Sequence, residues 1–410
     1  MTSIMKGKFV IDELITEDDR LYQSMMREFV ESQVFPVRKK FDEEWREPKI
    51  AHQILEKLLI ELGFQKAVLP VEYGGAGLNS IVTLFLALME LARGDIGLAV
   101  SLGCVFWPQF PLIYGFKNEH ILEWLSSLFS DNKPHLGCFA ITEPQGGSDI
   151  ENPRMEGRTI RTIATLDKDE WVINGVKQWP SNSKADFYLT VCTTNPTLGK
   201  EGIALIMVPG DSEGITVTEP FHKTGVSADY NATIYFKDVR VPKEFRLAGP
   251  GKDADALQLN LILGGLGSAV MSIGAAQNAF EIVTEYTSQR IVAGKPLKEH
   301  SIVAGILADM AIKIELARTY TMNIAYMFDH SDTKWSDELL AKARIAKVFS
   351  ARMATEVTGD AMHLMGSNGY SKDFEIEKLW RDVKESQIWL GGELMSKLDI
   401  ARYFCNLKQL

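Results

Sequence analysis

The spacing of apolar residues along the chain changes twice, and each change predicts a boundary. Over residues 16–41 apolar positions recur at helical spacing, and a second helical stretch covers 52–63. The region 79–115 is apolar on all sides, which predicts helices packed between other elements. The first third of the chain is therefore expected to be helical.

The middle third has a shorter period, which predicts β-strands. Its segments are rich in Val, Ile, Thr and Tyr and are separated by Gly, Pro, Asn or Asp. They lie at about 159–166, 169–174, 186–194, 202–208, 214–219 and 232–241. From Ala254 onward the helical period returns in long segments, as in a helical bundle. We therefore predict an α+β fold with an N-terminal helical domain (1–134), a central β-domain (135–250) and a C-terminal helical bundle (251–410).

Composition and charge narrow the possible functions. The 410 residues carry a net charge of −10, which argues against an electrostatic nucleic-acid binder. Four scattered cysteines without C-x-x-C spacing indicate reduced thiols, with neither a disulfide framework nor a metal site. No apolar segment flanked by basic residues opens the chain, and no apolar run approaches membrane-spanning length. We expect a cytoplasmic protein without membrane insertion.

One polar loop is the strongest candidate for chemistry. The run C-F-A-I-T-E-P-Q-G-G-S-D-I (138–150) begins like a strand and continues into a turn. Gly146 and Gly147 let the backbone approach a flat ligand, while Thr142 and Ser148 offer hydroxyl groups. Most such loops are only turns. This one is followed by W-V-I-N-G-V-K-Q-W-P-S-N-S-K-A-D (171–186) and F-K-D-V-R-V-P (236–242).

These three runs, in this order, resemble the middle domain of the acyl-CoA dehydrogenases. The resemblance extends through R-I-V-A-G-K-P-L (290–297), L-A-D-M (307–310), and G-S-N-G-Y to W-R-D-V-K-E-S-Q-I-W (366–389). It implies that family's fold, with a barrel-like central β-domain and a C-terminal four-helix bundle. It also implies an FAD-dependent acyl-CoA dehydrogenase that acts on CH–CH groups, forms a homotetramer and passes electrons to electron-transferring flavoprotein.

The resemblance implies a flavin site in the middle domain. Phe139, Ile141 and Thr142 would lie along the isoalloxazine ring, and Trp179 and Ser181 would cover its other side. An indole supplies a flat apolar wall, and hydroxyl groups can orient the ring. Without the flanking motif, Trp179 would be interpreted as a core aromatic residue.

Other FAD contacts are implied farther along the chain. Arg290 matches an arginine that binds the pyrophosphate from a neighbouring subunit, since a guanidinium can bind two phosphate oxygens. His363 and Gly366 belong to the segment that meets the adenosine part of FAD, and Gly392 is a further cofactor contact. Taken alone, Arg290 would be interpreted as a surface arginine.

The resemblance breaks down at the catalytic base. The family's usual glutamate lies in I-Y-E-G-T, but here I-W-L-G-G (388–392) places Leu390 there, beside Gly391. A minority of members carry the glutamate earlier, immediately before an arginine, and that pair falls on Gly264 and Gly265. Leucine and glycine cannot accept a proton. Leu390, Gly391 and Ser148, which matches a contact to CoA, are the expected substrate-binding residues.

Asp95 is the candidate for a displaced catalytic base. It lies within an apolar stripe, where burial would raise the pKa of its carboxyl group toward that of a general base. The alternative is a structural role, because Gly94 breaks the helix and Asp95 could cap the next one. Glu393, three residues beyond Leu390, is a weaker candidate.

Three functions remain open. A displaced base could take a γ-proton from cyclohex-1-ene-1-carboxyl-CoA in a 1,4-elimination that gives a cyclic conjugated diene, as in anaerobic aromatic degradation. Ordinary α,β-dehydrogenation of another cyclic, branched or aromatic acyl-CoA is the second. A reduced-flavin monooxygenase or a non-catalytic flavin binder of the same fold is the third. The retained T-E-P-x-G-G-S-D run favours dehydrogenation, and the altered stretch 223–231 weakens it.

Overall fold

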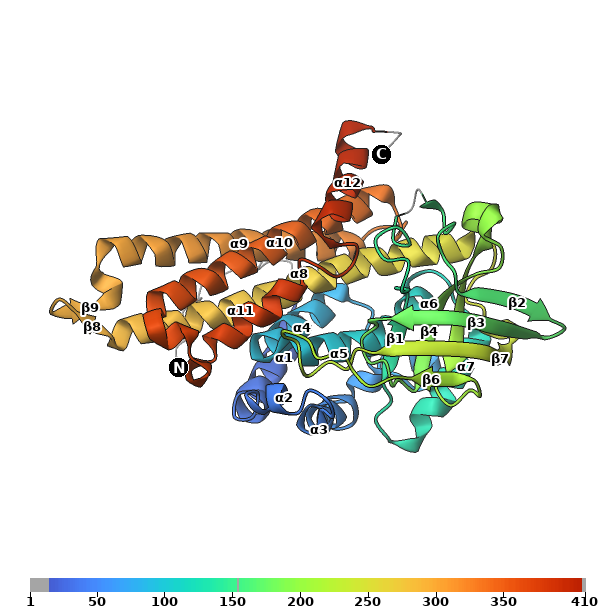
Figure 1. Cartoon of the computed structure of the whole chain (residues 1–410), viewed down its shortest axis with the longest axis horizontal. Coiled ribbons are helices and arrows are strands. Elements are labelled where there is room, and N and C mark those ends of the chain that lie inside the picture. The colour runs from blue at the N-terminus through green and yellow to red at the C-terminus, as the bar shows by residue number, and fades with distance from the viewer. Residues whose placement is uncertain (1–14, 153–154, 408–410) are drawn as a thin grey trace.

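The computed structural model describes residues 15–152 and 155–407. Its elements follow the predicted order of helices, strands and helices (Figure 1). Residues 1–14, on which the expectation of a chain without a signal peptide partly rests, lie outside the described residues.

The N-terminal region is helical, as predicted. Its helices are α1 (Glu17–Phe29), α2 (Lys40–Glu43), α3 (Lys49–Glu56), α4 (Ile81–Gly94), α5 (Ile96–Phe106), α6 (Phe110–Tyr114) and α7 (Glu119–Leu128). Thr16 starts α1 with a capping box, because its hydroxyl accepts from the Asp19 amide while the Asp19 carboxylate accepts from the Thr16 amide. The central pair α4 and α5 is buried almost throughout, which explains why its sequence is apolar on all sides.

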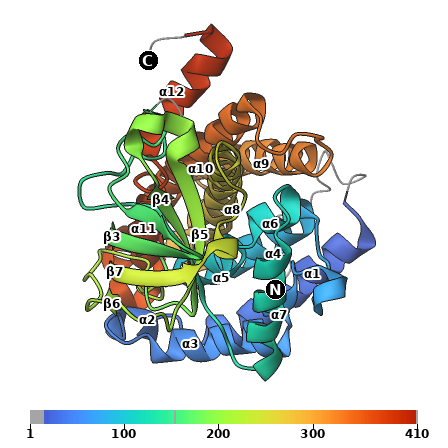
Figure 2. The same ribbon diagram turned by 90° about the vertical axis from the view of Figure 1, so that its right-hand side faces the viewer.

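The middle region forms one mixed sheet. Its strands are β1 (Gly137–Ala140), β2 (Ile163–Asp167), β3 (Glu170–Gln178), β4 (Phe187–Thr193), β5 (Ile203–Pro209), β6 (Ile215–Val217) and β7 (Thr233–Pro242). They lie in the order β1-β4-β2-β3-β7-β6, and β5 pairs with β4. Strand β1 runs parallel to β4. Figure 2 shows β3, β7 and β6 side by side in this sheet.

The C-terminal region is a bundle of long helices. It contains α8 (Lys252–Gln289), α9 (Ser301–Asp329), α10 (Asp337–Met365), α11 (Ile376–Glu385) and α12 (Gly392–Cys405), with a hairpin of β8 (Ile291–Val292) and β9 (Lys295–Pro296) after α8. By length and composition α8 could cross a membrane, contrary to the expectation from sequence. However, 94% of its most apolar window is buried inside the fold, so α8 is a core helix.

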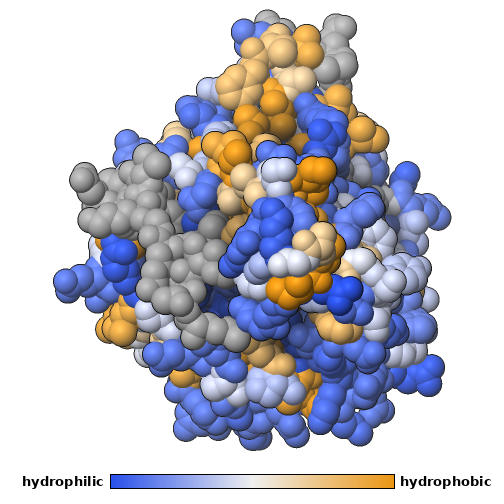
Figure 3. Space-filling model, turned by 90° about the vertical axis from the view of Figure 1, so that its left-hand side faces the viewer, coloured by the Kyte–Doolittle hydropathy of each residue, from blue (hydrophilic) through white to orange (hydrophobic). Residues whose placement is uncertain are grey.

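Helix α8 connects the three regions. It packs against α10, α9, α4 and α5, and against β5 of the sheet. Helix α12 instead projects from the body (Figure 1). Figure 3 shows apolar side chains gathered at this end of the molecule. The exposed apolar residues of α12 are Leu394, Leu398, Tyr403 and Phe404.

Candidate active site

The two positions where the resemblance places a glutamate come together in space. A Cβ atom added to Gly264 would lie 3.2 Å from Cδ2 of Leu390 and 2.4 Å from Cζ2 of Trp107. The rings of Trp107 and Phe139 lie 5.0 Å apart between centroids. Over 259–280 of α8, Gly264 alone is not buried. Gly264, Leu390 and Trp107 therefore form one apolar wall beside the residues expected at the flavin.

The turn that carries Leu390 also meets the loop expected at CoA. Leu390, Gly391 and Gly392 follow one another with φ of 52°, 72° and 64°. The exposed Ser148 donates its hydroxyl hydrogen bond to the Gly391 carbonyl at 3.3 Å. The structure thus brings together the three residues expected to bind substrate, although they are far apart in sequence.

The residues expected along the flavin ring also gather at one place. The Gln178 amide donates to the Thr142 carbonyl at 2.9 Å, which sets the end of β1 beside Trp179. Asn231 donates to the Trp179 carbonyl at 2.8 Å and to the Ser181 hydroxyl at 3.5 Å. Trp179 has φ of 70° and is 48% exposed, so its indole is not a core residue of the sheet. Phe139 and Ile141 are buried in and just after β1.

Three other expected FAD contacts lie elsewhere in the chain. Arg290 follows the far end of α8, and His363 and Gly366 lie at the end of α10. At 1.5 Å per residue, the 38 residues of α8 span about 57 Å, and Figure 1 shows the β8–β9 hairpin at the opposite end from the sheet. One chain does not bring Arg290 to Trp179. The roles of these three residues stay predictions, and they would need a second subunit.

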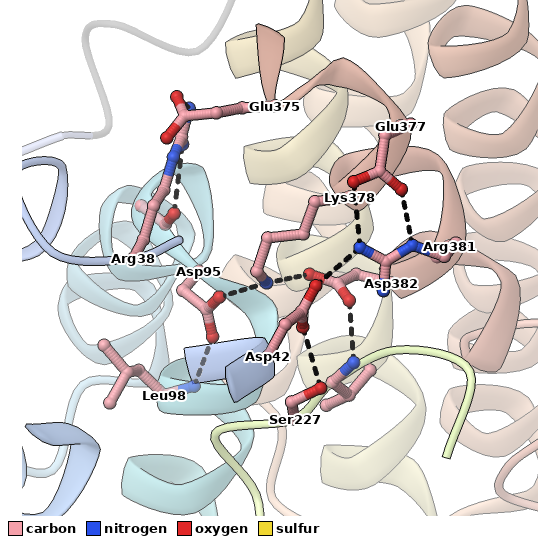
Figure 4. Close-up of polar contacts among 12 residues, drawn as sticks. Arg38, Asp42, Asp95, Leu98, Ser227, Glu375, Glu377, Lys378, Arg381 and Asp382 are labelled. Carbon is pink, nitrogen blue, oxygen red and sulfur yellow. Dashed lines mark hydrogen bonds and ion pairs between the residues drawn. The ribbon is translucent and has the colours of Figure 1, made fainter. Parts of the chain in front are cut away.

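Asp95 occupies the structural position considered as the alternative to catalysis. It is 1% exposed, and its Oδ1 caps α5 by accepting from the Leu98 amide at 3.0 Å. Its Oδ2 accepts from Lys378 Nζ at 2.6 Å, as Figure 4 shows. Both carboxylate oxygens of Asp95 are therefore engaged in structural contacts, one with the start of α5 and one with Lys378. We therefore correct the assignment of Asp95 as proton acceptor.

Lys378 is the centre of a polar network that joins the three regions. Burial opposes its charge, but Asp382, Asp95 and Asp42 outweigh burial and hold the pKa of Lys378 above its usual value. Lys378 lies 2.5 Å from Asp382, whose Oδ1 accepts from the Val226 amide at 2.7 Å. Asp95 belongs to the N-terminal helices, Val226 to the β-domain and Lys378 to α11, so the network has a structural role (Figure 4).

Glu393 is also a poor proton acceptor. It pairs with Arg352 and, at 2.5 Å, with Lys397. Hydrogen bonds from these two side chains lower the pKa of Glu393 to about 2. A carboxylate that holds its proton so weakly contributes little as a general base near neutral pH.

The sequence interpretation missed Glu385, a carboxyl group near the residues expected at the flavin. Glu385 ends α11 and is partly exposed, and within the described residues its side chain has no hydrogen bond or ion pair. Burial raises the pKa of Glu385 to about 7, opposed by Lys223 and reinforced by Asp229 and Asp382. Lys223 also donates to Asn231, the residue that contacts Trp179 and Ser181. In the sequence, the feature that could have pointed to Glu385 is its position in the run W-R-D-V-K-E-S-Q-I-W, five residues before Leu390.

Comparison with known proteins gives a consistent result along the chain. Residues 16–129, 138–239 and 255–404 match the N-terminal, middle and C-terminal domains of acyl-CoA dehydrogenase. The chain is 33% identical to the probable acyl-CoA dehydrogenase YngJ of Bacillus subtilis (strain 168), over 95% of this chain and 98% of that protein. It is 29% identical to the cyclohexane-1-carbonyl-CoA dehydrogenase of Syntrophus aciditrophicus (strain SB), over 94% and 96%. The solved butyryl-CoA dehydrogenase of Megasphaera elsdenii superimposes with a TM-score of 0.85 at 27% identity, covering 95% of this chain and 98% of that chain.

The fold, together with the Trp179 indole and the hydroxyl groups of Thr142 and Ser181 beside it, defines a flavin-dependent enzyme of the acyl-CoA dehydrogenase class. The chain belongs to the acyl-CoA dehydrogenase family, whose members are FAD-dependent oxidoreductases. Its own residues fit that cofactor, because an exposed indole with the hydroxyls of Thr142 and Ser181 nearby offers a flat face and polar contacts. FAD, when bound, supplies the acceptor for two electrons.

Proposed function

We propose that this enzyme dehydrogenates a cyclic acyl-CoA thioester, with cyclohex-1-ene-1-carboxyl-CoA as substrate and a cyclic conjugated diene as product. The observation that carries the proposal is the close approach of Leu390 to Gly264, where an added Cβ would lie 3.2 Å from Cδ2 of Leu390. Both expected positions of the family's base lack a carboxylate, which disfavours ordinary α-proton removal there. The cyclohexane-1-carbonyl-CoA dehydrogenase of Syntrophus aciditrophicus shows that a relative acts on a six-membered ring.

The substrate chemistry fits a site without an α-proton acceptor. An existing α,β double bond makes the γ-proton acidic, because the charge left behind passes to the thioester carbonyl. The γ C–H bond breaks and its electron pair forms a double bond to the β-carbon, while the electrons of the old double bond pass to the thioester carbonyl. Those electrons then return to form a double bond to the ring carbon on the other side as that carbon loses a hydride, for which bound FAD would be the acceptor. The substrate loses one proton and one hydride in total.

Glu385 replaces Asp95 as the proton acceptor in this proposal. Its support is a carboxyl group with no partner among the described residues and a pKa of about 7, which suits a general base at neutral pH. Asp382 and Glu385 are three residues apart on α11 and share a helix face. Asp382 contacts Val226, so that face is directed toward the loop that also holds Lys223.

The first experiment is anaerobic bleaching of the flavin on mixing with cyclohex-1-ene-1-carboxyl-CoA or, separately, its saturated analogue. We expect rapid bleaching by the unsaturated thioester and little by the saturated one. Bleaching only by the saturated or a straight-chain thioester would replace the proposal with α,β-dehydrogenation. If no thioester bleaches the flavin, the oxygenase or non-catalytic function takes its place.

Glu385→Gln tests the proton acceptor separately. The bleaching rate should fall by about 10²–10⁴-fold, while the thioester still binds. In the wild-type enzyme the rate should rise as the pH increases through about 7, because the ionised carboxylate is the active form. The adjacent exposed residue provides a control, Lys384→Gln, which should retain the rate and the pH profile. If Glu385→Gln bleached the flavin at the wild-type rate, Glu385 would be excluded as the proton acceptor.

The same proposal includes a cytoplasmic homotetramer that passes its electrons to electron-transferring flavoprotein. The proposed assembly is supported by the length of α8, which separates Arg290 from the sheet within one chain, and by the exposed apolar residues of α12. In a tetramer, a second subunit could supply Arg290 and His363 to the flavin. A monomeric mass by light scattering would contradict this assembly.

A further inference from the structure

The turn that carries Leu390 has a backbone that needs support. Leu390, Gly391 and Gly392 all have positive φ, and the left-handed region costs a residue with a Cβ roughly 1–2 kcal/mol. A leucine stays in such a conformation only when its surroundings fix it. What fixes this turn therefore also fixes the wall that Leu390 makes against Gly264 and Trp107.

Two buried charged side chains meet this turn from different regions of the fold. Arg344 of α10 donates from Nη1 to the Leu390 carbonyl at 2.9 Å and from Nε to Asp399 at 3.1 Å. Glu151, in the loop after Ser148, lies so close that a Cβ on Gly391 would be 3.2 Å from its Oε2. The Arg344 Nη2 and Glu151 Oε2 atoms are 3.8 Å apart. Arg344 is wholly buried, and Glu151 is 4% exposed.

The electrostatics of this pair favour a positioning role over a gain in stability. Burial raises the pKa of Glu151 against the opposing effects of Arg344 and Lys347. Burial and repulsion by Arg344 lower the pKa of Lys347 to about 7. Among the described residues, neither Arg344 Nη2 nor Glu151 Oε2 has a hydrogen-bond partner. Buried ion pairs with incomplete hydrogen bonding add little stability, but they can select one conformation.

The pair also lies where the chain lacks the charges suggested by the resemblance. In a minority of the family a glutamate–arginine pair falls at the positions of Gly264 and Gly265, and this chain has neither side chain there. A Cβ on Gly265 would lie 3.5 Å from the Ala343 carbonyl, immediately before Arg344 on the neighbouring helix. A glutamate and an arginine are therefore present beside the same turn, supplied by a β-domain loop and by α10 instead of α8.

We propose that Arg344 and Glu151 form a clamp on the Leu390–Gly392 turn, and that this clamp sets which acyl groups fit against Leu390. The clamp positions Leu390 and does not itself contact the reacting atoms. Because Ser148 and Glu151 belong to the same loop, the clamp also joins the expected CoA contact at Ser148 to the apolar wall that contains Leu390. This inference rests on the proposed function only in taking an acyl thioester as substrate.

The test removes both charges together, because loss of one alone would leave the other buried and unpaired. In the Glu151→Leu/Arg344→Met variant, Asp399 keeps Arg402 as a partner at 3.1 Å. We expect a folded, FAD-binding enzyme whose amides at 389–393 exchange hydrogen faster than in the wild type. The ratio of the Kd for butyryl-CoA to the Kd for the cyclic thioester should fall by about tenfold, the scale of discrimination by a shaped apolar pocket.

The matched control removes the exposed pair that also joins α10 to α12, in Arg352→Gln/Glu393→Gln. It should leave both the amide exchange and the Kd ratio unchanged. A double variant with wild-type exchange and an unchanged ratio would overturn the clamp. Glu151→Gln that abolished turnover without altering thioester binding would also overturn it, since Glu151 would then act in the chemistry. Failure of every thioester to bleach the wild type would contradict the proposed function, while the exchange result would still test the clamp.

Discussion

The environment of Asp95 shows where reasoning from sequence succeeds for a single residue and where it stops. The spacing of its apolar neighbours predicted burial, and the preceding glycine suggested a helix cap, and the structure has both features. The decisive partner, Lys378, lies 283 residues away and comes from α11. No local pattern contains that ion pair, so sequence alone could not choose between a base and a cap. Glu385 was missed for the same reason, because its pKa depends on a loop distant in sequence.

Replacing Asp95 with asparagine separates the two roles. Asparagine can still cap α5, and Lys378 keeps Asp382, so the main loss is one charged hydrogen bond. We expect the free energy of unfolding to fall by about 1–3 kcal/mol, while the thioester bleaches the flavin at nearly the wild-type rate. Chemical denaturation and anaerobic mixing measure the two effects. A stable variant without bleaching would restore Asp95 as the base.

Among the secondary-structure elements, the strands were the most predictable. All six predicted segments of the middle region became β2 to β7, because short runs of β-branched residues between turn residues are a local signal. The helical stretch 16–41 was predicted as one segment, but α1 ends at Phe29 and a π-helical turn follows at Val30–Val34. Irregular turns of this kind depend on tertiary packing and not on apolar spacing alone.

The candidate site was predicted only in part. Motifs located the Ser148 loop and the Leu390 turn, which the structure brings together. The meeting of Gly264 with Leu390 and Trp107 depends on how α8 lies against two other segments, and the sequence has no signal for that.

Two glycines of α8 give a matched test of this wall. Gly264→Ala would place a methyl group 2.4 Å from the Trp107 ring, whereas Gly267→Ala meets nothing within 4 Å. We expect Gly264→Ala to destabilise the protein by about 1–3 kcal/mol, and Gly267→Ala to stabilise it by about 0.5–1 kcal/mol through helix propensity. Thermal unfolding measures both. Two alanine variants of equal stability would mean that Trp107 moves away freely.

At the scale of the whole molecule, the polar network beneath the site joins regions that are separate in sequence. Arg381 pairs with Asp42 at 2.6 Å and donates to the Thr224 carbonyl at 2.8 Å, which links α11 to the N-terminal helices and to the β-domain. The same loop includes Ser227, which donates to Asp42 at 2.8 Å. A change in this network should therefore affect the stability of all three regions together.

Replacing Lys378 with methionine tests this coupling. The substitution leaves Asp95 and Asp382 buried without their shared cation, and we expect the free energy of unfolding to fall by about 3–5 kcal/mol at pH 7. The wild-type contribution is fully present at pH 5 and pH 7, because the raised pKa of Lys378 keeps it charged below its usual value of 10.5.

The pH dependence of this variant gives a second test. Lys378 opposes the effect of burial on the pKa of Asp382, so without Lys378 that pKa should rise further. The folded variant then binds more protons than the unfolded chain and becomes more stable as the pH falls toward 5. The gap between wild type and variant in chemical denaturation should therefore narrow from pH 7 to pH 5. Adding Asp95→Asn and Asp382→Asn to the variant should recover most of the loss at pH 7, because no buried charge then lacks a partner. If the difference in unfolding free energy between wild type and variant did not change with pH, then the packing of the Lys378 side chain, and not its charge, would hold the three regions together.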